Sequence, residues 1–222
     1  MVKQWPKQER PREKLLHQGS GALSDSELLA IILRTGVKGK SVVSLARDLL
    51  QEFGGLRPLM QANFEDASQI KGLGPAKFAQ LCAVLEIAKR YLFAEMQQLG
   101  TISNPEQATD YLLMTMRDYD AEVFACLLLD SRNRVLLYQE LFRGSINSTS
   151  VYPREVLKLV IQENAAAVIF AHNHPSGDAT PSEADREITQ RLKRALALID
   201  VKVLDHLVIG EKVSSLMNLG YL

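Results

Sequence analysis

The sequence predicts an all-helical domain over residues 1–98, followed by an α/β domain over residues 99–222. In the first domain, apolar residues recur every three or four positions, which is the period of an amphipathic helix. In the second, amphipathic segments alternate with short apolar runs of strand length, as in α/β domains. The polar stretch MQQLGTISNPEQ separates the two patterns and marks the boundary near residue 98.

Four helices are expected in the helical domain. The first lies in LSDSELLAIILRTG, where Ser24 and Glu27 have capping-box spacing and Gly36 ends the helix. The second lies in KSVVSLARDLLQEFGG and ends at the glycine pair, and a short third helix covers residues 64–69. The fourth begins at Pro75, which suits a first helical turn, and continues as a long amphipathic pattern.

The α/β domain is expected to begin with a helix from Asn104–Pro105 to about Met116. Two strands follow, EVFACLLLD and RVLLYQELF, joined by a turn at SRN. The helix PREVLKLVIQEN then leads to AAAVIFA, a short apolar run typical of a buried strand. The helix SEADREITQRLKRALALI and the strand VKVLDHLVIG complete the domain.

Composition excludes several classes of protein. The 222 residues are 46% hydrophobic and 23% charged, an ordinary globular profile that argues against disorder. The formal net charge is zero, so the molecule as a whole does not attract nucleic acid. Residues 1–99 nevertheless carry 14 lysines and arginines against 10 aspartates and glutamates, and the remainder carries 12 against 16. This asymmetry indicates two units with different partners.

The chain is expected to be cytoplasmic, with no membrane contact. Residues 1–20 form a polar arm without the apolar stretch of a signal peptide. No apolar run reaches the roughly 18 residues of a membrane span. Cys82 and Cys126 lie in apolar runs and are interpreted as buried free thiols, which fits a reducing compartment.

The loop AHNHPSGDATPSEAD contains two of the four histidines of the chain. His172 directly follows the strand AAAVIFA, and sheets commonly present ligands at the carboxyl ends of their strands. Because residues two apart in extended backbone point the same way, His172 and His174 can converge on one ion.

A helix start follows the two histidines. Thr180 is the expected N-cap, Pro181 suits the first helical position, and Glu183 completes a capping box. Ser182 and Asp185 are three apart and share a face of the first turn. Two imidazoles, one carboxylate and a hydroxyl thus meet at one point. Three protein ligands with an open fourth position are typical of catalytic zinc.

This spacing resembles the JAMM/MPN+ metalloprotease motif, in which His-x-His is followed by seven residues, Ser, two residues and Asp. HNHPSGDATPSEAD, together with VYPREV, LSDSELLAIILRTG and GLGPAK, is similar to the bacterial RadC-type branch over nearly the whole chain. The resemblance implies a cytidine-deaminase-like α/β domain with a mixed sheet that acts as a zinc-dependent hydrolase.

The resemblance also implies roles for individual residues. It assigns one Zn²⁺ per chain to His172, His174 and Asp185, and gives Ser182 a part in stabilising an oxyanion. Many isopeptidases of the family have Ser or Thr between the histidines, and Asn173 departs from this pattern. Such a ligand set also tolerates iron or manganese.

Hydrolysis also requires a group that moves protons. The family uses an upstream glutamate at the beginning of a strand, and Glu122 matches it; Glu155 and Glu140 are the alternatives. His206 is interpreted as a buried, hydrogen-bonded histidine. Asp205 beside it is a candidate acceptor for the second N–H of a ligand histidine.

The segment KGLGPAK resembles the hairpin of helix-hairpin-helix modules. Glycines let backbone approach phosphate, so Lys71, Gly72, Gly74 and Lys77 are candidates for a DNA contact that is independent of sequence. The alternative is a plain turn between packed helices.

The function favoured by the sequence is zinc-dependent hydrolysis of a peptide or isopeptide bond in a peptide or protein substrate. The alternative is a DNA-associated, repair-linked protein that works through the helical hairpin and carries a structural or vestigial metal site. A metal-dependent nuclease is a third option, although the letters HNH match that nuclease motif only by coincidence, because its three residues are dispersed.

Overall fold

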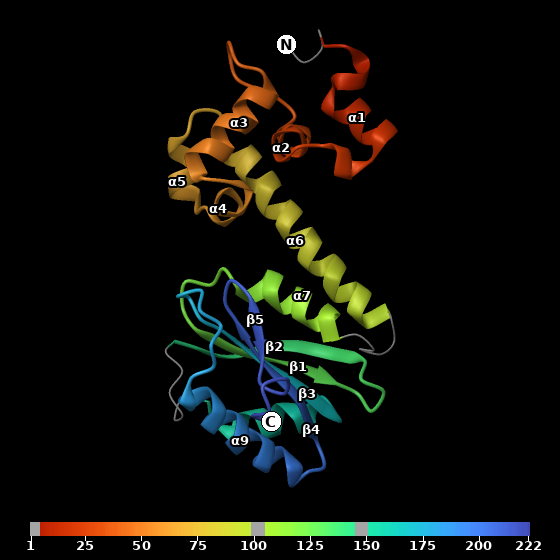
Figure 1. The fold of residues 1–222 in the computed structure, drawn as a ribbon, viewed down its shortest axis with the longest axis vertical. Helices are drawn as coiled ribbons and strands as arrows, with labels where there is room; N and C mark the ends of the chain where they lie inside the picture. The colour runs from red at the N-terminus through yellow and green to blue at the C-terminus, as the bar shows by residue number, and fades with distance from the viewer. Residues whose placement is uncertain (1–4, 99–104, 145–150) are drawn as a thin grey trace. The chain divides into compact units, whose positions relative to one another are not determined.

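The computed structural model describes residues 5–98, 105–144 and 151–222. The chain forms two compact units, Met1–Ala88 and Lys89–Leu222, so the division falls within the long helix α6 (Pro75–Gln98; Figure 1). The boundary predicted near residue 98 adjoins residues 99–104, which lie outside the described part of the chain and include Asn104, at the predicted start of the next helix. This boundary therefore stays a prediction.

The first unit is helical, as predicted. Its elements are η2 (Lys7–Glu9), α1 (Pro11–Gln18), η3 (Ser20–Ala22), α2 (Asp25–Leu33), α3 (Val42–Phe53), α4 (Leu56–Gln61), α5 (Phe64–Gln69) and the first part of α6. The polar arm expected over residues 1–20 is wrong, because α1 occupies much of it. Pro11 occupies the first turn of α1, and the Lys14 ammonium lies 3.0 Å from the Glu27 carboxylate of α2, which links the two helices.

The capping box of Ser24 and Glu27 is confirmed at the start of α2. The helix ends at Leu33 and not at Gly36, because Arg34 already has a left-handed φ of 64°. Gly36 instead permits a close backbone approach: a Cβ at this position would lie 2.2 Å from the carbonyl oxygen of Lys40. The loop after α2 therefore depends on glycine for space.

The hairpin before α6 has a structural role. Gly72 has a φ of +103°, and a Cβ there would lie 2.8 Å from a methyl group of Val37. Leu73 is fully buried in the core of the unit. Lys77 donates a hydrogen bond of 2.6 Å to the carbonyl of Thr35, and burial lowers the pKa of Lys77. Contact with DNA through this hairpin stays a prediction.

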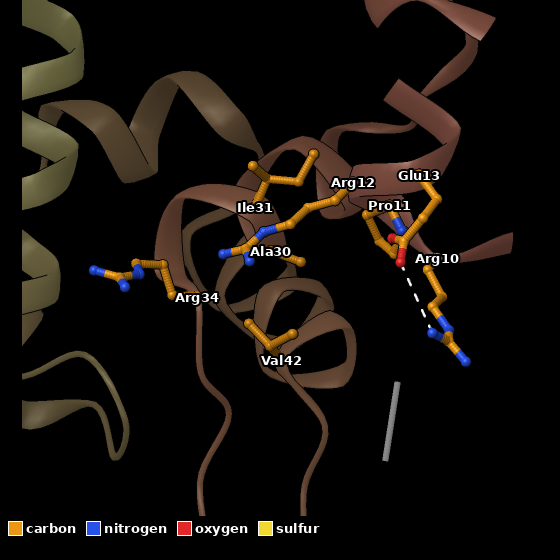
Figure 2. Close-up of a pocket in the computed structure, with 8 residues that line it drawn as sticks. All are labelled: Arg10, Pro11, Arg12, Glu13, Ala30, Ile31, Arg34 and Val42. Carbon is orange, nitrogen blue, oxygen red and sulfur yellow. Dashed lines mark ion pairs between the residues drawn. The ribbon is translucent and has the colours of Figure 1, made fainter. Parts of the chain in front are cut away.

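A surface cavity of about 460 Å³ also lies in this unit (Figure 2). Its lining comes from α1, α2, α3 and adjoining residues: Arg10, Pro11, Arg12, Glu13, Ala30, Ile31, Arg34 and Val42. Figure 2 shows Arg10 and Arg34 pointing to opposite sides, and Arg10 lies 3.8 Å from Glu13.

The second unit is an α/β domain around a mixed sheet, as predicted. Its elements after α6 are α7 (Pro105–Met116), β1 (Val123–Leu129), β2 (Val135–Arg143), α8 (Pro153–Gln162), β3 (Ala167–Asn173), α9 (Glu183–Ala197), β4 (Lys202–Ile209) and β5 (Val213–Ser215). The strand order is β2-β1-β3-β4-β5, in which only β3 and β4 pair in parallel. The three-residue β5 was not predicted, since it is too short to show alternation.

The sheet is buried on both faces at its centre. The side chains of β1 alternate: Val123 and Ala125 pack toward α7, whereas Phe124 and Cys126 pack toward α8 and α9. Figure 1 shows α7 and α9 on opposite faces of the sheet. This two-sided burial explains why β1 and β3 are almost entirely apolar in sequence, and it makes the few polar side chains there conspicuous.

Two expectations drawn from composition have different outcomes. Cys126 is buried as expected, and burial raises the pKa of its thiol to about 12. Cys82 is exposed, so its predicted burial is wrong. None of the described helices carries an apolar stretch long enough to cross a bilayer.

Candidate metal centre

His172 lies within strand β3 and not just after it, because β3 extends to Asn173. It pairs with Phe124 of β1, and the two rings are stacked at a centroid distance of 6.3 Å. Its side chain therefore faces the α9 side of the sheet. The backbone N–H of His174 donates to the carbonyl of Ile209 at 2.8 Å, which holds the loop after β3 against β4.

Asp185 is brought to the same place by the start of α9. Ser182 is the N-cap, and its backbone N–H donates to the carboxylate of Asp185 at 2.7 Å. The prediction that Thr180 caps the helix and Glu183 completes the box is therefore wrong by two residues. The hydroxyl and N–H of Thr180 bind the carboxylate of Asp178 instead. The Ser-x-x-Asp spacing of the motif is thus itself a capping box.

Three ligand atoms converge at this point. The Nε2 atoms of His172 and His174 are 3.0 Å apart, and they lie 3.1 and 3.6 Å from the two carboxylate oxygens of Asp185. The side chains of His172 and Asp185 are almost completely buried. Two imidazole nitrogens and one carboxylate in a buried setting fit a divalent ion such as zinc. The arrangement is the one expected from the sequence, and the identity of the ion stays a prediction.

The charges of these groups depend on one another. Burial alone raises the pKa of Asp185, but hydrogen bonds with His172, His174 and Ser182 lower it below its ordinary value. The hydrogen bond with Asp185 is the main cause that raises the pKa of His174. The cluster therefore holds an ionised carboxylate in a buried position, and such a group requires a positive partner.

The second nitrogens of both histidines also have partners. His172 Nδ1 lies 2.8 Å from His206 Nε2, and His174 Nδ1 donates to the carbonyl of Asp178 at 2.6 Å. The prediction that Asp205 serves as this partner is wrong, because its carboxylate accepts from Ser215 Oγ at 2.6 Å. His206 is fully buried as predicted, and burial lowers its pKa well below the ordinary value.

Glu122 directly precedes β1 on the same face of the sheet as His172. It stands two residues before Phe124, whose partner in β3 is His172, so the alternation of the strand assigns Glu122 to the same face as His172. The charge of Glu122 is also among the causes that raise the pKa of His174, after the larger effect of Asp185. Both observations support Glu122 as the candidate base, and this role stays a prediction.

The two alternative glutamates have other partners. Glu140 pairs with Ala125 in the sheet, so it belongs to the face that packs toward α7, and its carboxylate accepts from Tyr119 Oη at 2.6 Å. Glu155 is exposed on α8 and lies 3.2 Å from Arg154. Glu140 thus lies on the face opposite to His172, and Glu155 pairs with Arg154 on the exposed surface of α8, which favours Glu122.

Asn173 is a residue whose role was not predicted. It is fully buried, and its side chain accepts from the backbone N–H of Val123 at 2.7 Å and donates to the carbonyls of Tyr119 and Ala121 at 3.3 and 3.1 Å. These contacts hold the segment that carries Glu122 against β3. Asn173, the residue between the two histidines, therefore connects β3 with the segment that precedes β1 and carries Glu122.

We expect Asn173→Ala to lower the free energy of unfolding by about 3 kcal/mol, because it leaves buried backbone groups without partners. Chemical denaturation measures this change. The matched control is Gln139→Ala, which removes an exposed amide from β2 and should change stability by less than about 0.5 kcal/mol. Equal, small effects of both substitutions would contradict the role assigned to Asn173.

Comparison with known proteins adds an independent finding. The family model described as RadC-like JAB domain matches residues 102–221, and the model described as UPF0758 N-terminal matches residues 2–79. A UPF0758 protein of Thioalkalivibrio sulfidiphilus is 54% identical over 100% of this chain and 99% of its own length. UPF0758 proteins of Stutzerimonas stutzeri and Aeromonas hydrophila are 57% and 56% identical over 95% and 96% of the chain, and 94% and 95% of their lengths are covered. The similarity expected from the motif is confirmed.

Proposed function

The chain belongs to the family of RadC-like JAB domain proteins, which has a JAMM/MPN-type fold, and from this premise we propose that it is a zinc-dependent hydrolase of peptide or isopeptide bonds. The proposal depends on one observation: His172, His174 and Asp185 each offer a ligand atom, and these three atoms lie within 4.8 Å of one another. Three ligands of this kind leave a fourth position for water or substrate.

Each residue then has a chemical task. His172, His174 and Asp185 would hold the ion, which would supply an acidified water and polarise the carbonyl of the substrate. Glu122 accepts the proton of the attacking water and passes it to the leaving amine. This task requires a carboxylate that does not bind the ion, and the charge of Glu122, which contributes to the raised pKa of His174, supports it.

Ser182 is proposed to stabilise the oxyanion. Its hydroxyl donates to Asp185 at 2.6 Å and accepts from the N–H of that residue at 3.2 Å, which are the contacts of a helix cap. The hydroxyl therefore lies beside a proposed ligand. To donate to an oxyanion, it must turn away from Asp185, while its oxygen can continue to cap α9.

Removal of the metal tests the proposal. The purified protein is offered a library of peptides and of peptides joined through a lysine side chain, before and after treatment with a chelator. We expect cleavage to fall at least about 100-fold after chelation and to return when zinc is added, because the ion activates the water. Iron and manganese, added separately, identify the ion that restores the highest rate. Cleavage that survives complete metal removal, or zinc-loaded protein that cleaves neither class, contradicts the proposal.

A further inference from the structure

Thr189 lies one turn after Asp185 on α9 and is fully buried. Its hydroxyl oxygen is 2.5 Å from the carbonyl oxygen of Asp185 and 2.5 Å from Nδ1 of His206. A carbonyl oxygen only accepts hydrogen bonds, so the single hydroxyl proton of Thr189 must point to Asp185. The hydroxyl can then offer His206 only a lone pair, and Nδ1 of His206 must be the donor.

The position of the proton on His206 determines the position of the proton on His172. A neutral imidazole has one N–H, so with Nδ1 protonated the Nε2 of His206 is an acceptor. The atom 2.8 Å away is Nδ1 of His172, which must therefore carry the proton of that ring. The rings of Phe124 and Phe170 contact His206 at centroid distances of 5.3 and 6.1 Å and enclose it, which favours a neutral ring.

We propose that Thr189 and His206 are positioning residues that hold His172 in the tautomer whose Nε2 lone pair faces the metal centre. The hydrogen bond from His174 Nδ1 to the carbonyl of Asp178 likewise places the proton of His174 on Nδ1 and leaves a lone pair on its Nε2. When both rings are neutral, two Nε2 lone pairs and an ionised carboxylate face one another with no N–H between them, whereas the hydrogen bonds to Asp185 that raise the pKa of His174 require a proton on its Nε2. The arrangement with both rings neutral suits a cation, so the inference rests on the metal centre of the proposed function.

This chain of hydrogen bonds differs from the common arrangement, in which a ligand histidine donates to a carboxylate or a backbone carbonyl. Here His172 donates to a neutral imidazole, so no second negative charge lies beside it. The chain also ends at the backbone of Asp185, whose side chain is itself a proposed ligand. The first turn of α9 therefore supplies one ligand and sets the orientation of another.

The test compares Thr189→Val with Thr189→Ser. Valine keeps the shape of threonine but removes the hydroxyl, whereas serine keeps the hydroxyl and serves as the matched control. We expect Thr189→Val to raise the Kd for zinc by about 10- to 100-fold, measured by competition with a chromophoric chelator, and Thr189→Ser to change it less than about threefold. His206→Gln, whose side-chain oxygen can accept from His172, is expected to retain more affinity than His206→Leu.

Ring-nitrogen NMR of the histidines separates positioning from packing. In metal-free wild type at mildly alkaline pH, we expect the proton on Nδ1 of both His172 and His206, and a mixture of tautomers in Thr189→Val. A proton on Nε2 of His172 in the wild type overturns the inference. So does a Thr189→Val variant that binds zinc more weakly while its His172 spectrum stays unchanged. A wild type that binds no metal contradicts the proposed function, and the tautomers of the metal-free protein still decide the inference.

Discussion

Glu122→Gln is expected to keep its zinc and to lose hydrolysis. The substitution preserves the shape and polarity of the side chain but removes the proton acceptor. The rate on a substrate cleaved by the wild type should fall about 100-fold or more, which is the usual scale for the loss of general-base catalysis. Zinc content should stay at about one per chain, because the three proposed ligands are unchanged. Metal analysis and the cleavage rate, measured on the same preparation, test both parts.

Glu140→Gln and Glu155→Gln are the matched controls for this prediction. Both remove a carboxylate from the same domain, but Glu140 contacts Tyr119 and Glu155 contacts Arg154 on the exposed surface of α8. Their rates should stay within about threefold of the wild type, since neither group is the proposed base. Loss of zinc in Glu122→Gln would identify Glu122 as a ligand. If Glu122→Gln cleaves at the wild-type rate and one of the controls cleaves much more slowly, the glutamate replaced in that control is the base.

The parts of the fold that could be predicted from sequence are those governed by residues close together in the chain. The capping box of Ser24 and Glu27 spans one helical turn, and the strands β1 and β3 are continuous apolar runs. Such signals require no knowledge of distant contacts. The resemblance to the JAMM/MPN+ family predicted the mixed sheet. The single stretch AHNHPSGDATPSEAD predicted the convergence of two histidines with one aspartate.

The start of α9 shows where local signals are insufficient. Both Thr180 with Glu183 and Ser182 with Asp185 have capping-box spacing, so the sequence alone offers two registers. The second register is the one in which the carboxylate at the third helical position also lies 3.1 Å from His172. A tertiary contact therefore selects between two equally good local motifs.

The supporting residues of the site could not be predicted, because their partners are remote in the chain. His172 and His206 are 34 residues apart, and Asn173 and Val123 are 50 residues apart. Neither pair has a sequence pattern of its own. His206 between apolar residues of a predicted strand was nevertheless visible in the sequence, whereas Asn173 lay in the predicted loop after the strand AAAVIFA. Polar groups of this kind are buried only with hydrogen-bond partners, so their presence predicts a network without naming its members.

His172→Ala and Asp185→Ala are expected to lower zinc content from about one per chain to near zero. Each variant removes one of the three converging ligands, and two remaining ligands bind zinc far more weakly. Metal analysis after dialysis measures the content. Asp185→Ala also removes half of the capping box, but Ser182 still accepts from the backbone N–H at position 185 and keeps the start of α9. Circular dichroism should therefore show a folded protein.

Two further variants separate the loss of a ligand from the loss of structure. Asp185→Asn keeps an oxygen that can accept from Ser182 but lacks the negative charge, so it should retain the fold and bind little zinc. Glu183→Ala removes an exposed carboxylate from the same turn, where it contacts Arg186, and should bind zinc as the wild type does. If His172→Ala and Asp185→Ala both retain full zinc, the ion lies elsewhere and the proposed hydrolase mechanism fails. If Glu183→Ala loses zinc to the same extent, the loss reflects the first turn of α9 and not a ligand.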